Sequence, residues 1–184
     1  MKSSLIKVVI LCSIMISAAV QTSANAGEQH DGRIFYSYES NGGDYINAIG
    51  VGVTHRYHHS NLGFQLNTSL GYAEVLAQDG FLEEYTSWEA SARFGYFSKI
   101  SLFVEFGIDL GEALFEDYRY DRDDYCHYDE YCYQDDIDGY VGFGAGIKAG
   151  PIAVEGIVRA REIDSRYWEA ESEVFTGVQV SLNF

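Results

Sequence analysis

The sequence predicts an all-β protein, an eight-stranded antiparallel up-and-down transmembrane β-barrel that follows a cleaved N-terminal signal peptide. Three observations predict this fold. Segments in which bulky apolar and small or polar side chains alternate recur along the chain, and the connections between them alternate between short and long. The face opposite the bulky side chains is rich in glycine and in charges of both signs. These patterns predict a closed sheet with two unlike faces.

The first 26 residues have the features of a secretory signal peptide. Two lysines accompany an apolar stretch at 5–20, and an Ala-Asn-Ala cleavage sequence ends at residue 26. The apolar stretch is shorter than the ~20 residues that a membrane-spanning helix needs. We therefore expect residues 1–26 to be removed and residues 27–184 to form a single barrel domain.

The composition is strongly acidic. The formal net charge is -16, and removal of the two lysines of the signal peptide lowers it to -18. A chain of this charge will not bind nucleic acid through phosphate neutralisation. Export would place Cys126 and Cys132 in an oxidising compartment, which predicts a disulfide bond between them.

Eight segments alternate with the period of a β-strand. Residues 62–72 are typical, since Leu66 and Leu70 lie on one face while Gln65 and Asn67 lie on the other. No segment after the signal peptide is apolar for long enough to form a membrane-spanning helix. The predicted strands are 32–40, 44–57, 62–74, 84–97, 100–112, 137–149, 152–162 and 171–184.

The predicted connections sort by length. Tight turns are expected near 58–61, 97–99 and 149–151, and longer loops near 75–83, 113–136 and 163–170, with 40–43 as a short exception. Membrane barrels place short turns on the periplasmic side and longer loops outside the cell. We therefore expect both termini at the periplasmic end and an extracellular loop at 113–136.

The glycine-rich faces are predicted to line the lumen. Glycine weakens a strand interior and packs nothing, so rows of glycine fit where space is short, as inside a barrel of about eight strands. Charges of both signs on this face are expected to pair, because an unpaired buried charge is costly. The predicted lumen charge network comprises Arg33, Arg56, Glu89, Arg93, Glu105, Asp109, Lys148, Glu155, Arg159, Arg161 and Glu173.

The last predicted strand carries a specific motif. Val180, Leu182 and Phe184 alternate with small or polar residues, and the sequence ends on the aromatic side chain. This motif resembles the terminal signature of bacterial outer-membrane β-barrel proteins, and the architecture is similar to that of the small OmpA/OmpX-like superfamily of surface-antigen and porin-like barrels. The resemblance implies an integral location in the outer membrane of a Gram-negative cell, contact with its lipid and lipopolysaccharide, and recognition of the motif by the barrel-assembly machinery.

Some small outer-membrane barrels are enzymes that act on lipid A. His58, Ser60 and Asn61 resemble the His-x-Ser-Asn segment of the lipid A 3-O-deacylases, but they lie in a predicted periplasmic turn without an acid in phase with them. A palmitoyltransferase barrel would need an N-terminal amphipathic helix, for which only residues 27–31 are available. We therefore predict no catalytic residues, no enzymatic activity and no cofactor.

The predicted extracellular loop is crowded with carboxylates and tyrosines. Asp121, Asp123, Asp124 and Asp129 offer oxygen ligands to Ca²⁺ or Mg²⁺, but their spacing matches no EF-hand loop, and a charge run is usually a solvated surface. A disulfide would hold the tip of this loop in one shape. Exposed tyrosines can then serve as a recognition surface.

Several functional classes follow from these patterns. The leading hypothesis is an integral outer-membrane protein with a structural or surface-interaction role, whose acidic, Tyr-rich loop is the recognition surface for an extracellular partner. The alternatives are a narrow channel, a lipid A modifying enzyme and a secreted lipocalin-like binder. The last of these requires the bulky side chains, such as Leu66, Val104 and Val180, to point into the barrel.

Overall fold

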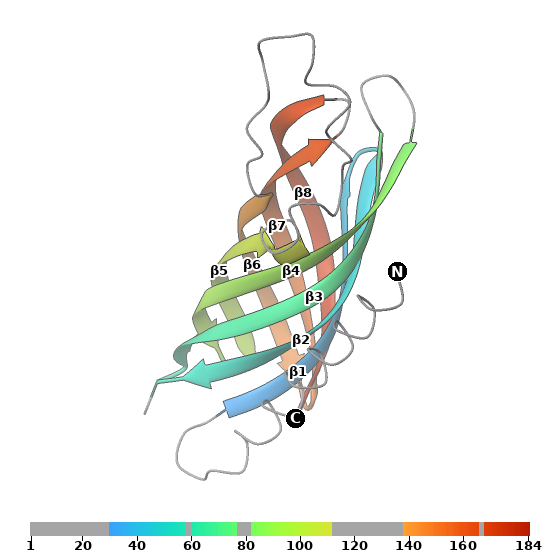
Figure 1. Ribbon diagram of the computed structural model, residues 1–184. Coiled ribbons are helices and arrows are strands. Elements are labelled where there is room, and N and C mark those ends of the chain that lie inside the picture. Colours follow the sequence, from blue (N-terminus) through green and yellow to red (C-terminus); the bar gives the residue numbers. More distant parts are fainter. Residues whose placement is uncertain (1–29, 58–59, 77–81, 112–137, 166–167) are drawn as a thin grey trace, which may run out of the picture.

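Eight antiparallel strands form one closed barrel, in which each strand pairs with its neighbours in sequence and β8 closes against β1 (Figure 1). The computed structural model describes residues 30–57, 60–76, 82–111, 138–165 and 168–184. The strands are β1 (His30–Asn41), β2 (Asp44–Arg56), β3 (Leu62–Leu76), β4 (Leu82–Phe97), β5 (Ile100–Asp109), β6 (Gly139–Ala149), β7 (Ile152–Ser165) and β8 (Trp168–Asn183). The predicted all-β up-and-down architecture is confirmed.

Three sequence predictions concern segments outside the described residues. These are the signal peptide at 1–26, the Cys126–Cys132 disulfide and the loop at 113–136 with its four aspartates. Within the described ranges, no helix has the length and hydropathy to cross a membrane.

Both ends of the described chain lie at the same end of the barrel, at the bottom of Figure 1. Arg33 pairs with Asn183 there, and the backbones of Gly32 and Phe184 exchange two hydrogen bonds of 2.9 Å. The β2–β3, β4–β5 and β6–β7 connections also turn at this end, so we call it the turn end and the opposite one the loop end. Gly150, with a φ of 61°, supplies the left-handed residue of the β6–β7 turn.

The β7–β8 hairpin is longer than the sequence predicts. Pairing continues to Ser165 and Trp168, with a register shift after Ile163, so the predicted long loop at 163–170 is wrong. β6 pairs with β7 only as far as Glu162, and the hairpin continues beyond it. Residues 163–170 show no regular alternation of apolar and polar side chains, so the period-two pattern does not identify them as strand. β3 and β4 likewise pair as far as 76 and 82, which shortens the predicted loop at 75–83.

β5 ends three residues earlier than predicted. The carboxylate of Asp109 accepts a hydrogen bond from the backbone N–H of Gly111 at 2.6 Å and another from that of Trp88 at 3.3 Å. When a side chain accepts hydrogen bonds from backbone N–H groups, these groups no longer need a partner strand. The ladder between β4 and β5 therefore stops at Asp109.

The outer and inner faces of the barrel have opposite chemistry. Leu66, Val104 and Val180 are 54%, 49% and 45% exposed on the outside, whereas Gln65 and Glu105 are 4% and 1% exposed inside. A soluble carrier with an apolar interior would have the reverse arrangement. The structure therefore excludes the lipocalin-like alternative.

Interior glycines make room for large side chains of the adjacent strand. A Cβ at Gly107 would lie 2.2 Å from the ring of Tyr140, and a Cβ at Gly144 would lie 2.4 Å from the ring of Phe103. A Cβ at Gly142 would likewise collide with the side chain of Arg159, one at Gly146 with that of Glu155, and one at Gly177 with that of Glu39. Large interior side chains therefore lie flat against glycines in the wall, which explains the glycine rows.

The variant Gly107→Ala tests this packing. The guanidinium groups of Arg159 and Arg161 both contact the ring of Tyr140, so this ring has little freedom to move away from a new methyl group. We expect Gly107→Ala to lower the free energy of unfolding by about 1–3 kcal/mol, measured as the urea midpoint of the barrel refolded in detergent micelles. The matched control is Gly43→Ala, where a Cβ meets nothing within 4 Å. Equal midpoints for the two variants would contradict the packing.

Candidate functional site

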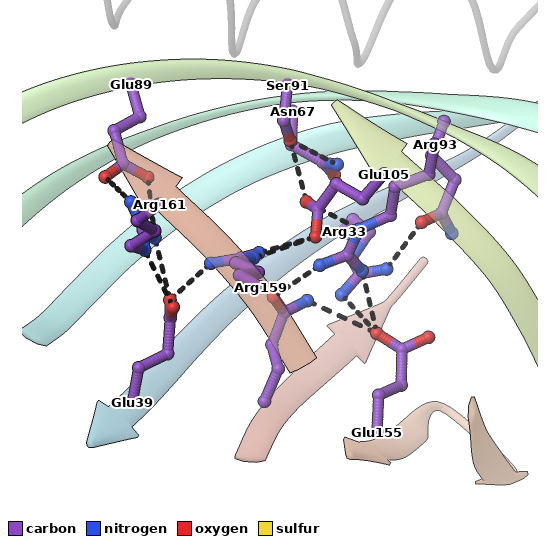
Figure 2. Close-up of polar contacts among 12 residues, drawn as sticks. Arg33, Glu39, Asn67, Glu89, Ser91, Arg93, Glu105, Glu155, Arg159 and Arg161 are labelled. Atoms are coloured by element: carbon purple, nitrogen blue, oxygen red, sulfur yellow. Dashed lines mark hydrogen bonds and ion pairs between the residues drawn. The ribbon is translucent and has the colours of Figure 1, made fainter. Parts of the chain in front are cut away.

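Four arginines and four glutamates form a continuous chain of ion pairs inside the barrel (Figure 2). They come from β1, β4, β5 and β7, and their formal charges cancel. We call this set the lumen network. Its members are Arg33, Glu39, Glu89, Arg93, Glu105, Glu155, Arg159 and Arg161.

The half of the lumen network nearer the loop end is centred on Glu39. Arg161 donates to Glu39 at 2.9 Å and to Glu89 at 2.8 Å, so it links β7 to both β1 and β4. Arg159 also donates to Glu39. Glu39 is therefore shared by two guanidinium groups, which offsets the cost of burying its charge.

The half nearer the turn end is centred on Glu105 and Glu155. Glu105 accepts from Arg159 at 2.8 Å and from Arg93 at 2.9 Å. Arg93 continues to Glu155 at 3.0 Å, and Glu155 accepts from Arg33 at the same distance. The signs therefore alternate without interruption from Glu89 of the first half to Arg33.

Neutral side chains complete the hydrogen bonding of these charges. Gln179, which is fully buried, accepts from Arg93 at 2.9 Å, and Gln65 accepts from Arg33 at 2.9 Å. Ser101 donates to Glu155 at 3.2 Å. Buried charges are tolerated when they are both paired and hydrogen-bonded. The two amides and the hydroxyl supply hydrogen bonds in addition to the ion pairs.

Aromatic rings support the guanidinium planes. The ring centroid of Tyr140 lies 4.6 Å from Cζ of Arg159 and 4.3 Å from Cζ of Arg161, and that of Phe103 lies 4.3 Å from Cζ of Arg93. Cation–π contacts of this kind gain strength when they are removed from water. The rings and ion pairs together fix the orientation of the arginines.

Two predicted members of the network, Arg56 and Lys148, do not join it. They lie at the turn end, where Arg56 forms an ion pair with Asp31 and the Lys148 Nζ lies 3.6 Å from the same carboxylate. All three side chains are partly exposed. The mouth of the barrel is wetter than its centre, so these residues pair locally.

The predicted members Asp109 and Glu173 also lie apart from the lumen network, towards the loop end. Asp109 accepts from the backbone at the end of β5, as described above. Glu173 accepts a hydrogen bond from the side-chain amide of Asn41 at 2.7 Å. The structure thus joins seven of the predicted residues and adds Glu39, which is in phase with Arg33 and Ser37 on β1. That phase is the sequence signal that could have identified it.

The segment that resembles a deacylase motif belongs to the β2–β3 turn. The hydroxyl of Ser60 accepts a hydrogen bond from the backbone N–H of Leu62 at 3.0 Å, and the amide of Asn61 donates to the hydroxyl of Tyr96 at 3.1 Å. His58 lies outside the described residues. Across the described ranges, no group of three or more His, Cys, Asp or Glu side chains is arranged to hold a metal ion.

The outward face forms an apolar band around the barrel. On β8 and the residue after it, the outward positions run from Val174 to Phe184, a length of roughly 34 Å at about 3.4 Å per residue. A strand tilt of about 40° converts this to about 26 Å along the barrel axis. The apolar band of outer-membrane barrels is about 25 Å high.

The C-terminal motif lies on this band. Val180, Leu182 and Phe184 all point outward and are exposed. The ring of Phe184 lies over Gly32, where a Cβ would be 2.6 Å away. The motif therefore lies beside the seam where β8 closes against β1.

The variant Glu105→Gln tests whether the lumen network holds the barrel together. It leaves the charges of Arg93 and Arg159 with fewer partners, and we expect it to lower the free energy of unfolding by about 3–5 kcal/mol. The measurement is equilibrium unfolding in urea in detergent micelles. The control Glu162→Gln removes an exposed carboxylate from β7 and should change stability by less than about 0.5 kcal/mol. A network without a structural role would give the same midpoint for both variants.

The comparisons with known proteins give structural neighbours alone. Neither protein-family models nor curated protein sequences match the chain. Among solved structures, a de novo designed transmembrane β-barrel has a TM-score of 0.43 at 11% identity, covering 86% of this chain and 100% of that chain. The outer membrane protein Ail of Yersinia pestis, solved in a phospholipid bilayer nanodisc, has a TM-score of 0.43 at 14% identity. This match covers 85% of this chain and 100% of the Ail chain. At this level of similarity, neither neighbour's role transfers to this chain.

Proposed function

We propose that the chain is an integral outer-membrane barrel with a structural or surface-interaction role and no catalytic activity. The observation that carries this proposal is the inverted chemistry of the barrel, with an apolar band outside and paired charges inside. Soluble monomers rarely expose contiguous apolar patches larger than a few hundred Å². A lipid bilayer accepts such a band, and closure leaves no unpaired strand edge in the hydrocarbon.

The lumen network favours an anchoring barrel over a channel. Its ion pairs connect β7 across the interior to β1, β4 and β5 at distances of 2.8–3.0 Å. A permeating ion would have to break these pairs, and each broken pair leaves a buried charge without compensation. This arrangement supports a barrel that holds its surface segments in place.

The surface-interaction role is proposed for the segment at 113–136. β5 ends at Asp109 and β6 begins at Gly139, both at the loop end, so the segment leaves and re-enters the barrel there. Its sequence is dominated by acids and tyrosines, which are suited to recognition and too polar to enter hydrocarbon. We propose that it contacts an extracellular partner.

A charge at the middle of the apolar band tests the membrane location. We expect Val104→Arg to make folding into lipid vesicles less favourable by about 2–4 kcal/mol, because Val104 lies midway along the outward face of β5. Thr86→Arg is the control, because Thr86 is exposed and lies towards the loop end, where the substitution should cost about 0–1 kcal/mol. Urea titration of folding into vesicles measures both. An outward face that meets water would tolerate the two substitutions equally.

Protease treatment of intact cells tests the orientation. We expect cleavage within 113–136, while the β2–β3 turn stays intact until the outer membrane is permeabilised. Mass spectrometry of the fragments from the outer-membrane fraction identifies the cut sites. Faster cleavage after reduction would support the Cys126–Cys132 disulfide. Recovery of the protein in the soluble periplasmic fraction, or cleavage at the β2–β3 turn alone, would contradict the proposal.

A further inference from the structure

The outward wall over β1–β4 becomes more polar in successive rows towards the loop end. Cross-strand pairing defines each row. The first row contains Tyr36, Ile49, Leu70 and Trp88. The second contains Tyr38, Asn47, Tyr72 and Thr86. The third contains Ser40, Tyr45, Glu74 and Glu84. The rows thus pass from mainly apolar, through aromatic and amide groups, to carboxylates over a few residues of strand.

Five of these residues form a continuous surface that we call the tyrosine patch: Tyr36, Tyr38, Tyr45, Asn47 and Tyr72. The rings of Tyr38 and Tyr45 stack with centroids 6.5 Å apart and planes 22° apart. The hydroxyl of Tyr36 donates a hydrogen bond to Oδ1 of Asn47 at 2.6 Å. Because Oδ1 is the acceptor in this bond, the amide nitrogen of Asn47 is oriented as a donor on the outward face.

Two carboxylates border the tyrosine patch on the loop side. Glu74 is hydrogen-bonded to the hydroxyl of Tyr45, and Glu84 to that of Tyr72. Glu74 and Glu84 are directly opposite each other on β3 and β4. The border therefore supplies strong hydrogen-bond acceptors beside exposed aromatic faces.

The described part of the chain places no cation on this wall. Four of its arginines belong to the lumen network. The other cationic side chains, Arg56, Lys99 and Lys148, lie at the turn end. Among the described residues, a phosphate at the tyrosine patch would meet the two carboxylates and no compensating positive charge. The charges therefore favour a neutral ligand that is rich in hydroxyl groups.

We infer that the tyrosine patch binds the sugar headgroup of a glycolipid in the outer leaflet, an inference that rests on the proposed membrane location. The acyl chains of such a lipid would lie on Ile49 and Leu70 and on the apolar wall below them. This depth brings the headgroup to Tyr38, Asn47 and Tyr72, one row higher. Ring faces pack against the C–H face of a pyranose, while the amide donates to sugar hydroxyls and the carboxylates accept from them.

Lipid retention in a mixed bilayer tests the inference. The full barrel is reconstituted in vesicles of equal parts phosphatidylcholine, phosphatidylglycerol and digalactosyldiacylglycerol with matched acyl chains. After gentle extraction, native mass spectrometry counts the lipids that stay bound. We expect the digalactosyl lipid to be enriched about fivefold over phosphatidylcholine, which corresponds to about one net hydrogen bond. Asn47→Leu with Tyr72→Leu should abolish the enrichment, while Val141→Leu on the outward face of β6 should preserve it.

The outcomes separate this inference from the proposed function. Flotation with the vesicles is measured first, and a wild-type barrel that does not float overturns the proposed membrane location. A barrel that floats but retains all three lipids equally has only an unselective aromatic girdle, and enrichment of phosphatidylglycerol would indicate phosphate recognition. Either result overturns the sugar assignment alone. If the double variant does not fold, the single variants Asn47→Leu and Tyr72→Phe, the second of which keeps the ring, are measured in its place. Unchanged enrichment of the digalactosyl lipid in both single variants would also overturn the sugar assignment.

Discussion

The narrow lumen of an eight-stranded barrel is the constraint on which the rest of this structure depends. A barrel of this size has room for side chains and little else, so its interior must be filled. Hydrocarbon-compatible residues occupy the outside, which leaves the polar residues to fill the inside. Long guanidinium and carboxylate side chains fit this space only by lying against the wall, and the interior glycines provide the room. The glycine rows and the lumen network are therefore two consequences of one limit.

The lumen network also constrains the pairing register. Each of its eight charges has left water at a cost of several kcal/mol, and the cost is offset only while every charge keeps its partners. A slip of one residue in any of β1, β4, β5 or β7 would turn its charged side chains towards the outside and leave their partners unpaired. The network is thus weak evidence for high stability but a strong constraint on a single arrangement of strands.

The charges are distributed unequally along the barrel axis. The network itself is neutral, the cations Arg56, Lys99 and Lys148 lie at the turn end, and Glu74, Glu84 and Glu173 lie towards the loop end. The acidic segment at 113–136 joins the barrel at that same end. A barrel oriented as we propose would present carboxylates and tyrosines outside the cell, which suits contacts with neutral, hydroxyl-rich groups better than contacts with phosphate.

The sequence by itself determined the strands and the face on which each side chain lies, because both follow from the period of two along a single strand. It placed Leu66 outside and Glu105 inside correctly, but it did not predict that β7 and β8 pair as far as Ser165 and Trp168, because residues 163–170 lack a regular alternation of apolar and polar side chains. Only the tertiary structure decided which charges pair. Arg159 and Glu39 are 120 residues apart in sequence, and their contact depends on strand tilt and closure, which no single strand encodes. Arg56 and Lys148 share the inward phase of the network, yet their height along the axis brings them to Asp31 at the mouth instead.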